Sequence, residues 1–141
     1  MAQAVPAGLA VITPGEFRAL CFEAARRTGG EVTRWSVPEV TPNFHEVHLG
    51  HVDHRGTVVV LWTPEGDVAL TASAEPLPPI EFVDDAALMA VLAELSSDVR
   101  VWAKAELDRP FTAAEWPGLD AHDVRYWRPQ RVGDVLFNWW D

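Results

Sequence analysis

One run of residues limits the possible folds more than any other part of the sequence. Residues 57–63 read Thr-Val-Val-Val-Leu-Trp-Thr, most of them β-branched or aromatic. Such residues favour strands, and a strand with one face in water would alternate apolar and polar side chains. The run therefore predicts a central strand that is buried on both faces.

The segments around this run predict an antiparallel meander. Residues 31–37 and 44–52 are rich in β-forming residues. The turn Asp53-His54-Arg55-Gly56 leads into the central strand, and the turn Pro64-Glu65-Gly66-Asp67 leads out of it. Residues 68–74 then return antiparallel to the central strand.

Two further strands are expected later in the chain. Apolar and polar side chains alternate from Val99 to Asp108, which predicts a strand with one face in solvent. Residues 123–128 predict a last strand.

The helices are predicted from their caps and apolar faces. Thr13-Pro14-Gly15-Glu16 has the form of a capping box, and Gly29-Gly30 follows the helix that it opens. Asp84 or Asp85 caps a second helix, and Thr112 to Glu115 forms another capping box, limited to a short turn by Pro117-Gly118. The apolar positions that recur at helical spacing are Phe17, Leu20, Cys21 and Ala24 in the first helix, Leu88, Val91, Leu92 and Leu95 in the second, and Val132, Val135, Leu136 and Trp139 in a final short helix.

Together these elements predict one domain of the α+β class. The chain has 141 residues, the usual size of one domain, and no linker divides it. We expect residues 1–12 to be a flexible lead-in and residues 13–141 to form a single domain, with a mostly antiparallel sheet and helices packed on one face.

Charge and composition limit which partners and which cellular compartment we expect. The net charge of −10 disfavours nucleic acid, because phosphate backbones would be repelled. The start of the chain has no basic segment of a signal peptide, and no apolar run approaches the ~20 residues needed to cross a bilayer. Cys21 is the only cysteine, so no intramolecular disulfide forms. We expect a cytoplasmic protein without a membrane anchor.

The acidic residues are concentrated in one part of the sequence. Between Arg55 and Arg100 there is no lysine or arginine. This stretch is either a solvated face or a docking surface for a basic protein. Three prolines stiffen the crossing from Glu75 to Asp85, and Leu77, Ile80 and Phe82 offer an apolar centre within a charged rim. The candidate partner-binding residues are Glu65, Asp67, Glu75, Glu81, Phe82, Asp84 and Asp85.

The motifs of common enzymes are missing from the sequence. It contains no Gly-x-Ser-x-Gly elbow, no phosphate-binding loop, no Gly-x-Gly-x-x-Gly and no His-Glu-x-x-His. We therefore assign no catalytic residue and no cofactor, although a site assembled from distant segments would escape such a search.

The histidines leave a metal-dependent enzyme open as an alternative. His45, His48, His51 and His54 recur every three residues, a spacing that alternates faces on a strand. Three of them would converge on a metal ion only with a bulge or with a ligand from elsewhere, such as His122. Glu46 and His48 share a strand face and form either an acid–base pair or a plain surface contact.

The tryptophans are too many for so small a core. The chain has seven tryptophans, and six of them cannot all be fully buried in a core of this size: Trp62, Trp102, Trp116, Trp127, Trp139 and Trp140. Exposed tryptophans are common interface anchors, but they also serve to cover an open sheet face. Trp139 and Trp140 suggest a second alternative, a structural or regulatory module that associates with itself through a symmetric contact.

The C-terminal tail carries a resemblance. Tyr126-Trp127-Arg128-Pro129 and the segment from Gly133-Asp134 to Phe137-Asn138-Trp139-Trp140-Asp141 resemble the ending of small uncharacterised bacterial proteins. In its size, acidity and tryptophan content the chain is similar to the immunity proteins of bacterial polymorphic toxin systems. This resemblance implies an intracellular protein-binding domain that neutralises a cognate, basic toxin through an acidic surface containing tryptophan.

Overall fold

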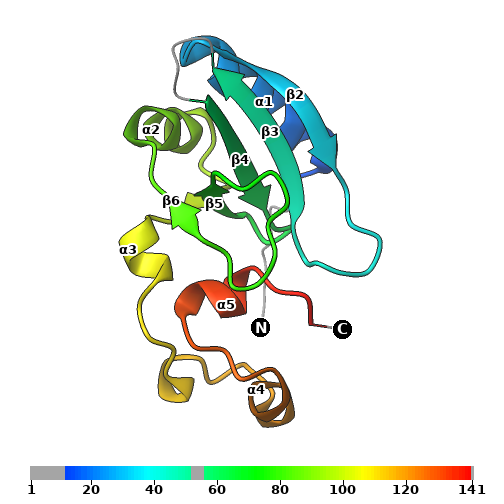
Figure 1. Cartoon of the computed structure of the whole chain (residues 1–141), viewed down its shortest axis with the longest axis vertical. Helices are drawn as coiled ribbons and strands as arrows, with labels where there is room; N and C mark the ends of the chain where they lie inside the picture. The colour runs from blue at the N-terminus through cyan, green and yellow to red at the C-terminus, as the bar shows by residue number, and fades with distance from the viewer. Residues whose placement is uncertain (1–11, 52–55, 141) are drawn as a thin grey trace.

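The computed structural model describes residues 12–51 and 56–140, and its centre is one mixed sheet (Figure 1). Antiparallel strands follow the order β2-β3-β4-β5-β6, and the short β7 pairs in parallel with β5. The strands are β2 (Gly30–Ser36), β3 (His45–His51), β4 (Gly56–Trp62), β5 (Asp67–Thr71), β6 (Phe82–Val83) and β7 (Arg100–Val101). β4 lies within the sheet, and all its residues from Val58 to Trp62 are buried, which confirms the predicted central strand.

Five α-helices and one short 3₁₀ helix complete the described fold. They are α1 (Pro14–Arg27), α2 (Ala86–Leu95), α3 (Lys104–Leu107), η1 (Ala113–Glu115), α4 (Ala121–Trp127) and α5 (Val132–Leu136). The two longest, α1 and α2, were both predicted. In the described part of the chain, no helix combines the length and the apolarity needed to cross a membrane.

The helix α1 forms for the reasons visible in its sequence. Thr13 Oγ1 accepts a hydrogen bond from the Glu16 N–H, and Glu16 Oε1 accepts one from the Thr13 N–H, so the capping box is complete. Phe17 and Cys21 face the sheet, and the Phe17 ring stacks on Trp62 with centroids 4.8 Å apart.

The sheet has a hydrophobic cluster on each face. On one face, α1 and α2 pack over side chains of β3, β4 and β5. Ile12, which we had placed in the flexible lead-in, is buried in this cluster. On the other face the chain after β5 and the C-terminal segment cover β4 and β5 (Figure 1). The second cluster contains Phe44, Val59, Leu61, Ala69, Ile80, Phe82, Leu107 and Phe137.

The strand predicted over residues 99–108 is wrong beyond its first residues. Within this range only Arg100 and Val101 form a strand, and residues 104–107 form α3. The Lys104 N–H donates to Asp84 Oδ1 and the Ala103 N–H donates to Glu106 Oε1, so both backbone groups at the start of the helix are satisfied. Leu107 is buried in the second cluster. These contacts with distant segments outweigh the alternating pattern.

The strand predicted over residues 123–128 is also wrong, because this segment is helical. Asp120 caps α4 by accepting a hydrogen bond from the His122 N–H at 2.7 Å. Arg128 ends the helix with a φ of 49°, in the left-handed region. The final helix was predicted correctly but ends at Leu136, before Trp139. The predicted turn at residues 53–55 lies outside the described residues.

The fold class is therefore confirmed. The chain forms an α+β domain with a mostly antiparallel sheet, and its two longest helices pack on one face.

Candidate functional site

The acidic segment of the sequence does not form one continuous acidic surface. Glu65 and Glu75 are exposed and form no ion pair with any described residue. The side chain of Glu81 is 85% exposed, and its carboxylate lies 3.8 Å from Lys104 Nζ. All three acids are exposed, and Glu81 alone of them forms an ion pair, with Lys104. Their role in binding stays a prediction.

Asp67 has a structural role instead, which corrects its place in the predicted surface. Its side chain is buried, and Oδ1 accepts hydrogen bonds from Arg100 Nη2 at 2.6 Å and from Trp102 Nε1 at 2.9 Å. The turn before it packs closely, because a Cβ on Gly66 would meet the Asp98 carbonyl oxygen at 2.5 Å. Asp67 therefore joins β5 to β7 rather than facing solvent.

The apolar centre predicted for the crossing is also mostly buried. Phe82 and Ile80 lie in the second cluster, with 0% and 4% of their surface exposed. Leu77 is 66% exposed, so it is the residue of this group that faces solvent. Phe82 pairs with Thr71 across the strands, and this register directs its ring into the core.

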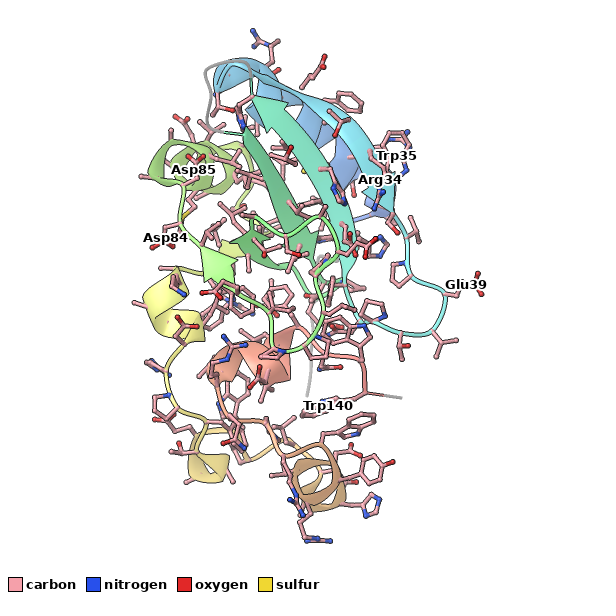
Figure 2. The ribbon with its side chains drawn as sticks, viewed as in Figure 1. Arg34, Trp35, Glu39, Asp84, Asp85 and Trp140 are labelled. Atoms are coloured by element: carbon pink, nitrogen blue, oxygen red, sulfur yellow. The ribbon has the colours of Figure 1, made fainter. Side chains whose placement is uncertain are left out.

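Asp84 and Asp85 each have a local structural role. Asp85 caps α2 by accepting a hydrogen bond from the Leu88 N–H at 3.1 Å. Asp84 accepts one from the Lys104 N–H at 2.8 Å. Figure 2 shows both beside α2 and β6, well away from Trp140. Reversing their charges would disturb two helix starts as well as the surface.

The C-terminal tail is held against the loop before β3 by two asparagines. Asn43 Nδ2 donates to the Leu136 carbonyl, and Asn43 Oδ1 accepts from the Asn138 N–H at 2.8 Å. Asn138 Oδ1 in turn accepts from the Trp140 N–H. This arrangement fixes the backbone of Trp139 and Trp140 after α5 has ended.

The tail and the end of α4 bring three tryptophans together. The Trp127 and Trp140 rings are nearly parallel, at 10°, with centroids 6.3 Å apart. Trp139 packs edge-on against Phe44, with centroids 5.3 Å apart. All three tryptophans are half-buried. The proposed self-association through Trp139 and Trp140 stays a prediction.

These tryptophans line a groove of about 290 Å³, hereafter the tail groove. Pro78, Pro79 and Ile80 of the crossing form another wall of it. The groove therefore adjoins the segment that carries Glu75, Leu77 and Glu81. In Figure 2, Trp140 lies below the sheet, between α5 and α4.

The meeting of the crossing and the tail could not be predicted, because the two segments lie far apart in the sequence and no motif links them. Arg128 also lines the groove and was not predicted as a site residue. Asp134, another lining residue, forms an ion pair with Arg131 at 2.9 Å.

The described histidines do not converge. His48 Nε2 lies 3.0 Å from Glu46 Oε1, so the predicted pair between these two residues forms. His45 contacts the Trp62 ring, His51 Nε2 lies 3.2 Å from Thr28 Oγ1, and His122 is exposed on α4. Among residues 12–51 and 56–140, no three His, Cys, Asp or Glu side chains are arranged to hold a metal ion. His54 lies outside these ranges.

The single thiol is buried in the first cluster. Cys21 is 0% exposed, and desolvation raises the pKa of its thiol far above the ordinary value. A thiol that does not ionise is a poor nucleophile, which agrees with the predicted packing role.

Comparison with protein-family models, with curated proteins and with solved structures found no match to this chain.

Proposed function

We propose that this chain is an intracellular protein-binding domain of the immunity type, which neutralises a basic toxin by occupying it. The observation that carries the proposal is the junction of the tail groove with the exposed acids of the crossing. An apolar, aromatic centre inside a charged rim is the usual composition of a protein interface.

The tryptophan rings of the tail groove offer a contact surface that is already ordered before a partner binds. The hydrogen bonds of Asn43 and Asn138 hold the tail backbone, and the contacts with Phe44 and Trp127 hold the rings of Trp139 and Trp140. A partner that buries these rings therefore loses little conformational entropy of the tail. Leu77, exposed beside the groove, extends the apolar centre.

The exposed acids determine which charge the partner should carry. Glu75 forms no ion pair with a described residue, and Lys104 bonds Asp108 at 2.8 Å more closely than it approaches Glu81. With a net charge of −10, the chain attracts basic proteins at long range, and this attraction weakens as salt is added.

The test begins with the genes on either side of the one that encodes this chain. Each neighbour is expressed alone and together with this chain, and growth is measured. The proposal expects one neighbour to stop growth, this chain to restore it, and the two purified proteins to form a complex whose association slows with salt. A set of neighbours of which none is toxic, or none is relieved, would contradict it.

A pair of matched variants locates the surface. Glu75→Lys with Glu81→Lys reverses two charges beside the tail groove, whereas Glu31→Lys with Glu39→Lys reverses two exposed charges on and after β2. Protection should weaken in the first variant and persist in the second. Light scattering on the free chain, over a dilution series, shows separately whether it associates with itself.

A further inference from the structure

The hydrogen-bond acceptors on the side chains of the tail groove already have donors. Among the lining residues, only Asp134 and Asn138 carry side-chain oxygens. The Asp134 carboxylate accepts hydrogen bonds from Arg131 Nη2 and from the backbone N–H groups of Gln130 and Arg131. Asn138 Oδ1 accepts one from the Trp140 N–H. A ligand that brings mainly donors would therefore find few free side-chain acceptors in the groove.

The polar side-chain groups that remain free in the groove are donors. The Arg128 side chain forms no hydrogen bond or ion pair with a described residue. The indole N–H groups of Trp127, Trp139 and Trp140 also have no acceptor among the described residues, and none of them is buried, in contrast to that of Trp62. A ligand that displaces water from these groups must bring acceptors.

An extended segment rich in proline has this balance of donors and acceptors. Proline has no backbone N–H, so such a segment presents carbonyl oxygens and few donors. In the polyproline II conformation these carbonyls have no partner within the segment, and little conformational entropy is lost on binding. Proline-rich segments commonly bind in grooves with aromatic walls, and three tryptophans and Phe137 line this one.

The size and walls of the groove suit a short extended segment. Its volume of about 290 Å³ equals that of ~10 water molecules. The rings of Trp127 and Trp140, which are nearly parallel, offer flat surfaces for proline rings. Figure 2 shows Trp140 at the end of the tail, beyond α5.

The charges favour a neutral centre and basic ends in the ligand. Within the groove Arg128 has no ion pair with a described residue and Asp134 is paired with Arg131, so an inserted cation would meet a like charge. On the crossing, Glu75 has no ion pair with a described residue, and the Glu81 side chain is 85% exposed. Basic residues are therefore expected beside the prolines rather than between the tryptophan rings.

We propose that the tail groove binds a proline-rich segment of the toxin that carries basic residues at its ends. The prolines pack on the tryptophan rings, their carbonyls accept hydrogen bonds from the free donors of the groove, and the basic residues face Glu75 and Glu81. This inference rests on the proposed function, because it names the part of the basic partner that the groove holds.

Short blocked peptides test the inference on the full chain without the toxin. The indole N–H cross-peaks of the groove are identified by NMR from their loss in Trp127→Phe, Trp139→Phe and Trp140→Phe. Acetyl-Arg-Pro-Pro-Pro-Pro-Arg-amide should shift them saturably, with a dissociation constant on the order of 1 mM. The same peptide with alanine for every proline should bind roughly tenfold more weakly, because it is not ordered before binding and adds N–H groups.

Variants of the chain separate the tryptophan rings from the acids. Trp140→Ala should weaken the proline peptide roughly tenfold, whereas Trp35→Ala, at an exposed position on β2 outside the groove, should not change it. Glu75→Lys with Glu81→Lys should weaken the proline peptide that has arginine ends and strengthen the one that has glutamate ends. These two exposed residues keep the test valid if circular dichroism shows that Trp140→Ala unfolds the chain.

Two results would overturn the inference. One is the absence of a saturable shift with the proline peptide, and the other is equal binding of the alanine peptide, which would mean that the groove takes any apolar side chain. A toxin complex that forms in spite of either result leaves the proposed function standing. Conversely, neighbours without a toxin overturn the proposed function, while saturable binding of the proline peptide still supports the groove as a site for proline-rich segments.

Discussion

Asp67 shows how a single buried carboxylate can look like part of a binding surface in the sequence. It follows an exposed turn and stands in a stretch without basic residues, but its two donors, Arg100 and Trp102, lie more than 30 positions away. The Asp67 carboxylate accepts three hydrogen bonds from these two residues. The fold needs this acceptor, because without it the Trp102 N–H has no hydrogen-bond partner.

Replacing this carboxylate should therefore destabilise the fold. Asp67→Ala is expected to lower the free energy of unfolding by about 2–3 kcal/mol, measured by urea denaturation. Glu65→Gln, two residues earlier and exposed, should change it by less than about 0.5 kcal/mol. Equal stability of the two variants would show that Asp67 is not a structural residue.

His45 gives a residue-level prediction about pH. Desolvation lowers its pKa in the folded state, so the unfolded chain binds the proton more readily. This contribution to stability is fully present above pH ~6.5 and declines as the pH falls toward the folded-state pKa. The His45 imidazole should titrate below pH ~6.5 by NMR, and the loss of stability on acidification should be smaller in His45→Gln. A midpoint at or above the ordinary value would contradict the burial argument.

At the level of elements, two capping boxes with the same sequence pattern differ in the structure. Thr13 and Glu16 cap each other as predicted, whereas the Thr112 side chain makes no cap hydrogen bond to η1. The difference follows from what each helix buries. The face of α1 packs on the sheet, but η1 has no buried residue.

This contrast predicts different costs for the same substitution. Thr13→Ala should lower the free energy of unfolding by about 1 kcal/mol, because it removes the acceptor for the Glu16 N–H. Thr112→Ala should have almost no effect. Chemical denaturation of both variants checks this, and a cost for Thr112→Ala as large as that for Thr13→Ala would contradict it.

The elements that could be predicted are those with local signals. The central strand, α1 and α2 were evident from apolar runs, caps and helical spacing. Residues 104–107 were predicted as part of a strand because their helical conformation depends on distant partners, such as Asp84 for the Lys104 N–H and the second cluster for Leu107. Residues 123–128 were predicted as a strand although the helix α4 has a local cap at Asp120. The same reasoning explains the site: exposed glutamates could be predicted, but the groove between crossing and tail could not.

At the scale of the whole molecule, the sheet joins its two clusters into one folding unit. Phe137, just after α5, is buried against Phe44 and Phe82, and its position ties the C-terminal tail to the sheet. The tail groove therefore exists only while this second cluster is intact.

Unfolding should accordingly be a single transition. Far-UV circular dichroism and tryptophan fluorescence should give the same midpoint in urea. Phe137→Ala should move both midpoints together and cost about 3–5 kcal/mol. Separate midpoints, with the tryptophan signal changing first, would show that the tail unfolds independently of the sheet.

The central claim is that the tail groove, together with the exposed acids of the adjoining crossing, binds a basic protein. The most direct measurement is the affinity and association rate of the purified chain for the toxic neighbour that it neutralises, at low and high salt. The account predicts that Trp140→Ala weakens the complex at least tenfold, and that Glu75→Lys with Glu81→Lys slows association at low salt and flattens its salt dependence. The control pair Glu31→Lys with Glu39→Lys should bind like the wild type. Wild-type affinity and association rate in both groove variants would contradict the claim.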